Sequence, residues 1–191
     1  MRSISVLLAF LAASAQADVI LFEDPVHRFW NHLEALCGQA YEGELIQHPE
    51  GERDFVGQRL IMHVRDCHSD WIRIPFQVGS DRSRTWVITR DEGRIRLRHV
   101  HRHEDGTPSD ISLYGGLASN RGEATRQYFP ADEQTRQVIE AAFSNVWMIE
   151  IEPGETLTYG LRRLGTPRVF QIDFDLSRTV AAPPPPWGWA D

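Results

Sequence analysis

The chain has 191 residues and a formal net charge of −7. It contains arginine but no lysine. An acidic balance argues against nucleic acid as the main partner, because the neutralisation of phosphates requires a basic face. With no lysine in the sequence, Schiff-base catalysis and a P-loop lysine are excluded.

The first residues have the pattern of a secretory signal peptide. Arg2 precedes an apolar run over residues 6–13, and Ala15-Gln16-Ala17 supplies the small-x-small ending typical of a cleavage site. The run is too short to cross a bilayer core of about 30 Å. We therefore expect a signal peptide over residues 1–17, cleavage near Ala17, and export to the periplasm or the exterior. The alternative is a buried N-terminal helix.

Cys37 and Cys67 are the two cysteines of the chain. In an oxidising compartment an even pair is expected to form a disulfide, which here would tie the end of the first helix to a strand end. The alternative is two buried, unpaired thiols.

Asp24-Pro25 opens a predicted helix in which apolar residues recur every three or four positions until Gly38 ends it. A second helix is predicted from Asp132 to Phe143. Between and after the helices the hydrophobic period is two, which is typical of strands. The strands expected from it are residues 41–46, 56–67, 71–78, 85–90, 94–102, 111–114, 124–129, 146–151, 156–163 and 168–176.

About nine or ten short strands with little helix indicate an all-β protein, most simply an antiparallel up-and-down barrel with one N-terminal and one late helix. We expect residues 18–180 to form this single barrel domain. Residues 181–191 are rich in proline and tryptophan. Such a tail is expected either to have no fixed structure or to dock Trp187 and Trp189 on the domain or on a partner.

The segment Leu36-Cys37-Gly38-Gln39-Ala40-Tyr41-Glu42-Gly43 resembles the opening of calycins, the lipocalin-like barrels, in which a short helix leads into a first strand with a glycine and a nearby aromatic residue. The chain also resembles a family of uncharacterised exported bacterial proteins. The calycin resemblance implies a barrel that encloses one small ligand. Haem is not favoured, because the haem-binding relatives place their axial histidine late in the barrel and this chain has no histidine after His103.

Residues 94–103 carry the most concentrated chemistry of the chain. Alternation along a strand places Ile95, Leu97, His99, His101 and His103 on one face. These histidines are candidates for the polar mouth of a cavity, and Leu97, Ile95, Val87 and Phe76 are the expected apolar lining. The alternative is a divalent transition metal bound by His99, His101 and His103.

Arginines dominate the opposite face. If residues 91–93 form the turn of a hairpin, Arg90 faces Arg94, and Trp86 lies on the arginine face near Arg98. Arg82, Arg84 and Arg98 are then a candidate anion site, and the alternative is a solvated surface of ion pairs.

Neither a Gly-x-Ser-x-Gly elbow nor a His-Glu-x-x-His helix is present. The expected function is therefore non-enzymatic binding of a small, partly apolar ligand. A metal-dependent enzyme with Glu104 as acid–base group is the first alternative. An envelope interaction protein that uses the tail and the arginine face is the second.

Overall fold

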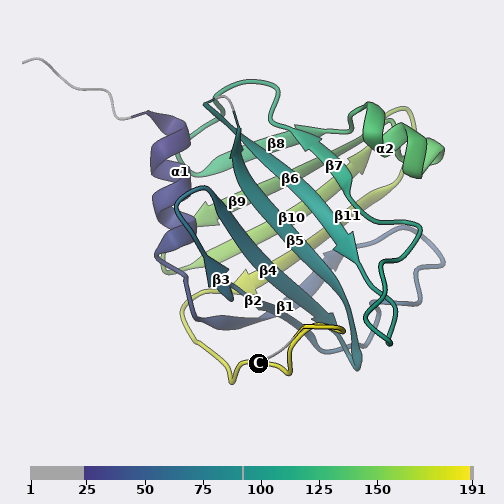
Figure 1. Cartoon of the computed structure of the whole chain (residues 1–191), viewed down its shortest axis with the longest axis horizontal. Helices are drawn as coiled ribbons and strands as arrows, with labels where there is room; N and C mark the ends of the chain where they lie inside the picture. The colour runs from purple at the N-terminus through teal and green to yellow at the C-terminus, as the bar shows by residue number, and fades with distance from the viewer. Residues whose placement is uncertain (1–23, 92, 190–191) are drawn as a thin grey trace, which may run out of the picture.

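A computed structural model describes residues 24–91 and 93–189, and their strands belong to one antiparallel sheet that curls into a nearly closed barrel (Figure 1). The strand order is β7-β6-β5-β4-β2-β1-β11-β10-β9-β8, and the short β3 pairs with β4 beside this path. Most strands therefore pair with a neighbour in sequence, and the pairing of β1 with β11 joins the two ends of the chain. The strands are β1 (Ala40–Gln47), β2 (Leu60–His63), β3 (Asp66–Cys67), β4 (Trp71–Val78), β5 (Asp81–Asp91), β6 (Arg94–His101), β7 (Tyr114–Leu117), β8 (Arg126–Pro130), β9 (Asn145–Glu152), β10 (Thr156–Arg163) and β11 (Val169–Asp175). The predicted up-and-down barrel is confirmed, and it is consistent with a calycin-like fold.

The barrel closes between β7 and β8 without a strand ladder, through hydrogen bonds between Gly115 and two residues that follow β8, Asp132 and Thr135. Thr135 Oγ1 accepts a hydrogen bond from the Gly115 amide at 2.8 Å and donates one to the Gly115 carbonyl at 2.6 Å. A Cβ atom on Gly116 would lie 1.8 Å from the carbonyl oxygen of Pro130, so the two backbones meet where only glycine fits. The strand predicted over residues 111–114 ends before these glycines, but Gly115 and Gly116 lie inside β7.

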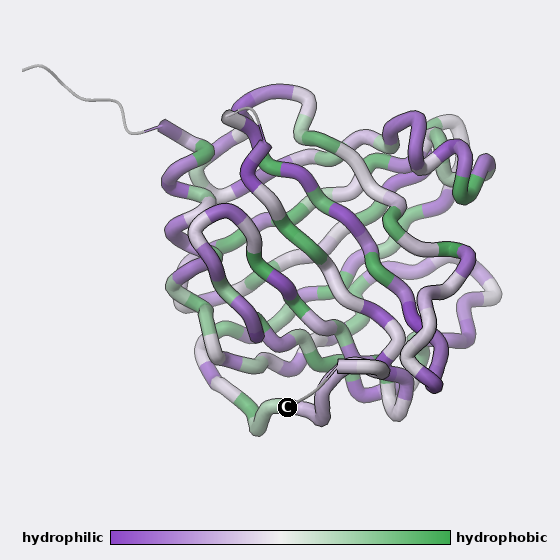
Figure 2. Tube along the Cα trace, viewed as in Figure 1, coloured by the Kyte–Doolittle hydropathy of each residue, from purple (hydrophilic) through white to green (hydrophobic). Residues whose placement is uncertain are grey.

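Hydrophobic and hydrophilic residues alternate along the strands (Figure 2), and the hydrophobic set fills the barrel. Across β5 and β6, Trp86 pairs with His99 and Ile88 with Leu97, so these four side chains point inward together. The predicted pairing was wrong by one residue, because Arg90 pairs with Ile95 and not with Arg94. A shift of one residue moves every side chain of one strand to the other face.

Helix α1 (Pro25–Glu34) lies across one end of the barrel, at the left of Figure 1. Asp24 caps it by accepting a hydrogen bond from the Val26 amide at 3.1 Å. Its buried face is formed by Val26, Phe29, Trp30 and Leu33. This N-terminal helix was predicted from the same cap and the same apolar spacing.

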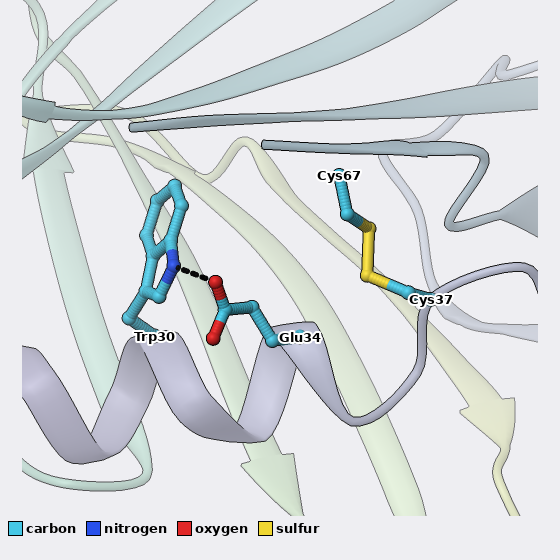
Figure 3. Close-up of a disulfide and its surroundings, with 4 residues drawn as sticks. All are labelled: Trp30, Glu34, Cys37 and Cys67. Atoms are coloured by element: carbon cyan, nitrogen blue, oxygen red, sulfur yellow. Dashed lines mark hydrogen bonds between the residues drawn. A yellow bond between two sulfur atoms is a disulfide. The ribbon is translucent and has the colours of Figure 1, made fainter. Parts of the chain in front are cut away.

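The predicted disulfide between Cys37 and Cys67 is confirmed, with the two Cα atoms 6.2 Å apart. It joins the turn after α1 to the short strand β3. Close to it, the Trp30 indole donates a hydrogen bond to Glu34 within the helix at 2.7 Å (Figure 3). The disulfide and the buried side chains of Trp30 and Leu33 together hold the end of α1 on the barrel.

The late helix is shorter than predicted. It consists of α2 (Glu133–Val138), which Asp132 caps through the Thr135 amide at 3.0 Å, and the 3-10 turn η1 (Glu140–Ala142). Residues 56–59 were predicted to be extended and instead belong to the loop before β2.

The described part of the tail lies against the outside of the barrel. Arg82 donates a hydrogen bond to the Pro185 carbonyl at 3.0 Å, and the guanidinium of Arg73 lies 4.9 Å from the ring centre of Trp189. The tail therefore docks on its own domain through Trp189, which is one of the two expectations from the sequence.

The signal peptide predicted over residues 1–17 lies outside the described residues. Among residues 24–91 and 93–189, no helix combines the length and the apolar character needed to span a membrane.

Candidate functional site

A cavity of about 330 Å³ opens at the end of the barrel opposite α1. The two ends are distinguished by β5, where Arg84 lines the cavity and Arg90, six residues later, lies 4.4 Å from the ring centre of Trp30 in α1. Ile139 and Ala142, from the segment after β8, cover part of the opening. A cavity of this volume is at the lower end of the range of small-molecule sites.

Stacked aromatic rings form the floor of the cavity. Trp86 stacks on Tyr159 with ring centres 4.4 Å apart and on Phe76 with ring centres 5.0 Å apart. Phe170 lies edge-on to Tyr159, and Trp147 lies beside His99 at 5.1 Å. Such a surface offers a flat apolar ligand both stacking and dispersion contacts.

His99 is the buried polar group of this floor, with a side chain only 3% exposed. Its Nδ1 lies 3.2 Å from the Tyr114 carbonyl and its Nε2 lies 2.8 Å from the Tyr159 hydroxyl. Because a carbonyl only accepts, Nδ1 carries the proton and Nε2 accepts from Tyr159. Burial lowers the pKa of His99 to about 3, so the imidazole is neutral at ordinary pH.

His101 lies one step further toward the opening. Its Nε2 is 3.0 Å from the Tyr114 hydroxyl, and burial, followed by the charge of Arg84, lowers the pKa of His101 to about 4. Burial also raises the pKa of Tyr114 to about 12. Histidines and tyrosines therefore form a neutral hydrogen-bonded set at neutral pH.

Three arginines line the mouth. Arg84 is paired with Asp81, whereas Arg163 donates from Nε to Asn145 Oδ1 at 2.8 Å. Arg168 is the third, and its charge helps burial to lower the pKa of Arg163. Glu52 and Asp54 line the same mouth from the loop before β2.

The structure brings together three of the seven predicted cavity residues. Phe76, His99 and His101 line the cavity, but His99 lies in the floor instead of at the mouth. Leu97 and Ile95 point inward as predicted and are fully buried in the core.

Two predicted residues lie elsewhere. Val87 faces outward, where it pairs with Arg73 and Arg98, because the hairpin register differs by one residue from the prediction. His103 lies beyond the end of β6 and is exposed, as is Glu104. Within residues 24–91 and 93–189, no group of three or more His, Cys, Asp and Glu side chains is placed to hold a metal ion.

The three arginines of the predicted anion site also lie apart. Arg98 forms a two-bond ion pair with Asp132, with distances of 3.0 and 2.5 Å, and Arg82 binds the tail. Only Arg84 reaches the cavity. The alternative, an outer face of ion-paired arginines, describes Arg96 and Arg98 correctly, since both contact Asp132.

Sequence reasoning missed the residues that other strands contribute. Tyr114, Trp147, Tyr159 and Arg163 come from β7, β9 and β10, and Arg168 directly precedes β11. Alternation could have placed Tyr159, Leu161 and Arg163 on one face, but only the barrel closure brings that face opposite His99.

In comparisons with protein-family models, curated proteins and solved structures, no match to the chain was found. The strand order is that of a nearly closed antiparallel barrel, which is consistent with a calycin-like fold.

Proposed function

We propose that this protein is an exported, non-enzymatic binding protein that holds one small, partly apolar ligand inside its barrel. The observation that carries the proposal is the aromatic-floored cavity, open at one end and closed at the other by α1. A preformed apolar cavity with a few polar groups is the usual form of a small-molecule site. The resemblance to lipocalin-like barrels supports the same reading.

The cavity favours binding over catalysis. His99 has both ring nitrogens engaged, by the Tyr114 carbonyl and the Tyr159 hydroxyl, and its pKa of about 3 leaves it a poor proton acceptor near neutrality. The Nε2 atom of His101 is engaged by the Tyr114 hydroxyl, and the pKa of about 4 leaves this imidazole a poor proton acceptor as well. These groups orient a ligand and stiffen the floor.

The proposal is tested by titrating the protein with N-phenyl-1-naphthylamine, a neutral aromatic compound that fluoresces in apolar surroundings. Wild-type protein should bind it with a saturable fluorescence increase. Leu161→Trp, which adds a large ring to the cavity wall, should abolish the increase because it occupies the ligand's volume.

Tyr128→Trp is the matched control, since Tyr128 is 45% exposed and does not line the cavity. Both variants need circular dichroism spectra and thermal transitions like those of the wild type. An equal fluorescence increase in wild type and in a folded Leu161→Trp protein would place the binding outside the barrel and refute the proposal.

Export is a separate part of the proposal. The Cys37–Cys67 disulfide supports it, because structural disulfides form and persist in oxidising compartments. Intact-mass measurement and N-terminal sequencing of the protein produced in a secreting host should give a chain that begins at Asp18. A full-length chain retained in the cytoplasm would contradict this part alone.

A further inference from the structure

We propose that the ligand is an amphiphilic organic anion, and that Arg163 and Arg168 bind its anionic group at the mouth while its apolar body lies on the aromatic floor. The inference rests on the proposed function and names the chemical class of the ligand. It predicts a carboxylate or sulfonate on a small aromatic or aliphatic body.

The first observation is that Arg163 is held in place but not neutralised. Its Nε donates to Asn145, which is only 5% exposed, so the terminal nitrogens of the guanidinium remain available at the mouth. Within the described chain, no carboxylate lies within 4.0 Å of Arg163 or Arg168. A planar guanidinium with its stem fixed is well suited to two-point recognition of a carboxylate.

The second observation concerns Arg168. Its Nε is buried, and no atom of residues 24–91 or 93–189 accepts a hydrogen bond from it. A buried donor without an acceptor is destabilising, and a guanidinium carries charge as well. Because Arg163 and Arg168 line one cavity and repel each other, an anion between them would relieve both effects.

The third observation is the arrangement along the strands. Tyr159, Leu161 and Arg163 occupy one face of β10, and Phe170 follows Arg168 by two residues on the neighbouring chain segment. Alternate residues of a strand are about 6.6 Å apart, so Arg163 lies about 13 Å beyond Tyr159 along the strand. From Tyr159 to Arg163, the cavity wall therefore changes from aromatic to cationic over a distance that matches the length of a small amphiphile.

Acidic groups at the mouth do not cancel this charge. Glu52 accepts a hydrogen bond from the Asp54 amide at 2.9 Å, and neither carboxylate is within 4.0 Å of an arginine of the described chain. Asp81 is engaged by Arg84 and by the Ser83 amide at 2.8 Å. Among the described residues, Arg163 and Arg168 are thus the two arginines of the mouth without a carboxylate within ion-pair distance.

The test compares two compounds that share one apolar body. 1-Anilinonaphthalene-8-sulfonate is N-phenyl-1-naphthylamine with an added sulfonate, so the ratio of their dissociation constants isolates the contribution of the anion. Wild-type protein should bind the sulfonate about tenfold or more tightly than the neutral compound. Rising salt should reduce this ratio, because the attraction is partly exposed to solvent.

The Arg163→Gln/Arg168→Gln double variant should lose the preference for the sulfonate while it binds the neutral compound as wild type does. Unchanged binding of the neutral compound also shows that the variant is folded. Arg162→Gln is the matched control, because it removes an arginine from the exposed outer face of the same strand. It should leave the ratio unchanged.

The outcomes separate the two proposals. Equal affinities of wild type for the two compounds, or a preference that survives the double substitution, would overturn the anionic ligand and leave the binding cavity intact. Binding of neither compound would overturn the proposed function itself. Displacement of the sulfonate by inorganic phosphate at matched ionic strength would assign the arginines to a free ion and overturn the amphiphile.

Discussion

His99 shows what a buried histidine does in this barrel. Alternation predicted its inward direction correctly, but placed it at a polar mouth, when it lies in the floor with both nitrogens engaged. The partner residues, Tyr114 and Tyr159, lie 15 and 60 positions away in the chain. Because the fold brings such distant partners together, the sequence identified His99 as an inward-facing histidine but could not predict its hydrogen bonds or its protonation.

The low pKa of His99 predicts a pH-dependent stability. The unfolded chain protonates this histidine near pH 6.5, whereas the folded protein does so only near pH 3, so the unfolded state binds more protons between these values. The free energy of unfolding should therefore fall as the pH drops below about 6.5, by up to about 1.4 kcal/mol per pH unit from this residue. Urea denaturation at several pH values measures the slope.

His99→Gln should make that slope shallower by a similar amount, since glutamine keeps hydrogen-bonding groups but does not titrate. His63 and His101, whose pKa values burial also lowers, contribute to the remaining slope. Carboxyl groups with lowered pKa values, such as Asp81 and Asp132, add to it at lower pH. The exposed substitution His48→Gln is the control. Parallel curves for wild type and His99→Gln would show that His99 is not held neutral in the fold.

At the scale of elements, the hairpin of β5 and β6 shows that an error of one residue in the predicted register changes which side chains face the cavity. The predicted turn placed Arg90 opposite Arg94, and the observed pairing with Ile95 differs by one residue. This difference moved Trp86 from an outer arginine face to the cavity floor and moved Val87 outward. The positions of the strands could be predicted from the hydrophobic period. Their register depends on the geometry of the turn between β5 and β6, which the turn residues did not determine.

The closure of β7 on β8 predicts a strong effect of a single methyl group. Gly116→Ala should destabilise the protein by about 2 kcal/mol or more, because the added Cβ would lie 1.8 Å from the Pro130 carbonyl oxygen. In Gly160→Ala the nearest atom is the flexible Met148 Cε at 3.2 Å, so the loss should be much smaller. Equal losses in chemical denaturation would mean that the seam is not closed as described.

The Cys37–Cys67 disulfide should stabilise the fold because it closes a loop and so lowers the conformational entropy of the unfolded chain. The two cysteines are 30 positions apart, and a loop of this length corresponds to about 3–4 kcal/mol. Cys37→Ala/Cys67→Ala should lower the free energy of unfolding by that amount. A reducing agent should have the same effect on wild type and none on the variant; no change in either would show that the bridge does not support the fold.

At the scale of the whole molecule, the architecture could be predicted because period-two patterns, turns and the helix signature at Asp24 agree with one another. The cavity wall could not be predicted, because its residues come from seven strands, which lie close together only after the barrel has closed. Nothing in the sequence distinguishes Arg163 and Arg168 from arginines on the surface. Their position at the opening distinguishes them, and it follows from how β10 meets β11.

The central claim, that a ligand occupies the barrel interior, is tested most directly by NMR of the tryptophan indole groups. The chain has six tryptophans, of which Trp86 and Trp147 line the cavity. Saturation with 1-anilinonaphthalene-8-sulfonate should shift the indole signals of these two residues and leave the signal of Trp30, at the opposite end, in place. Shifts confined to Trp30, Trp71 or Trp189, with Trp86 and Trp147 unchanged, would contradict the account.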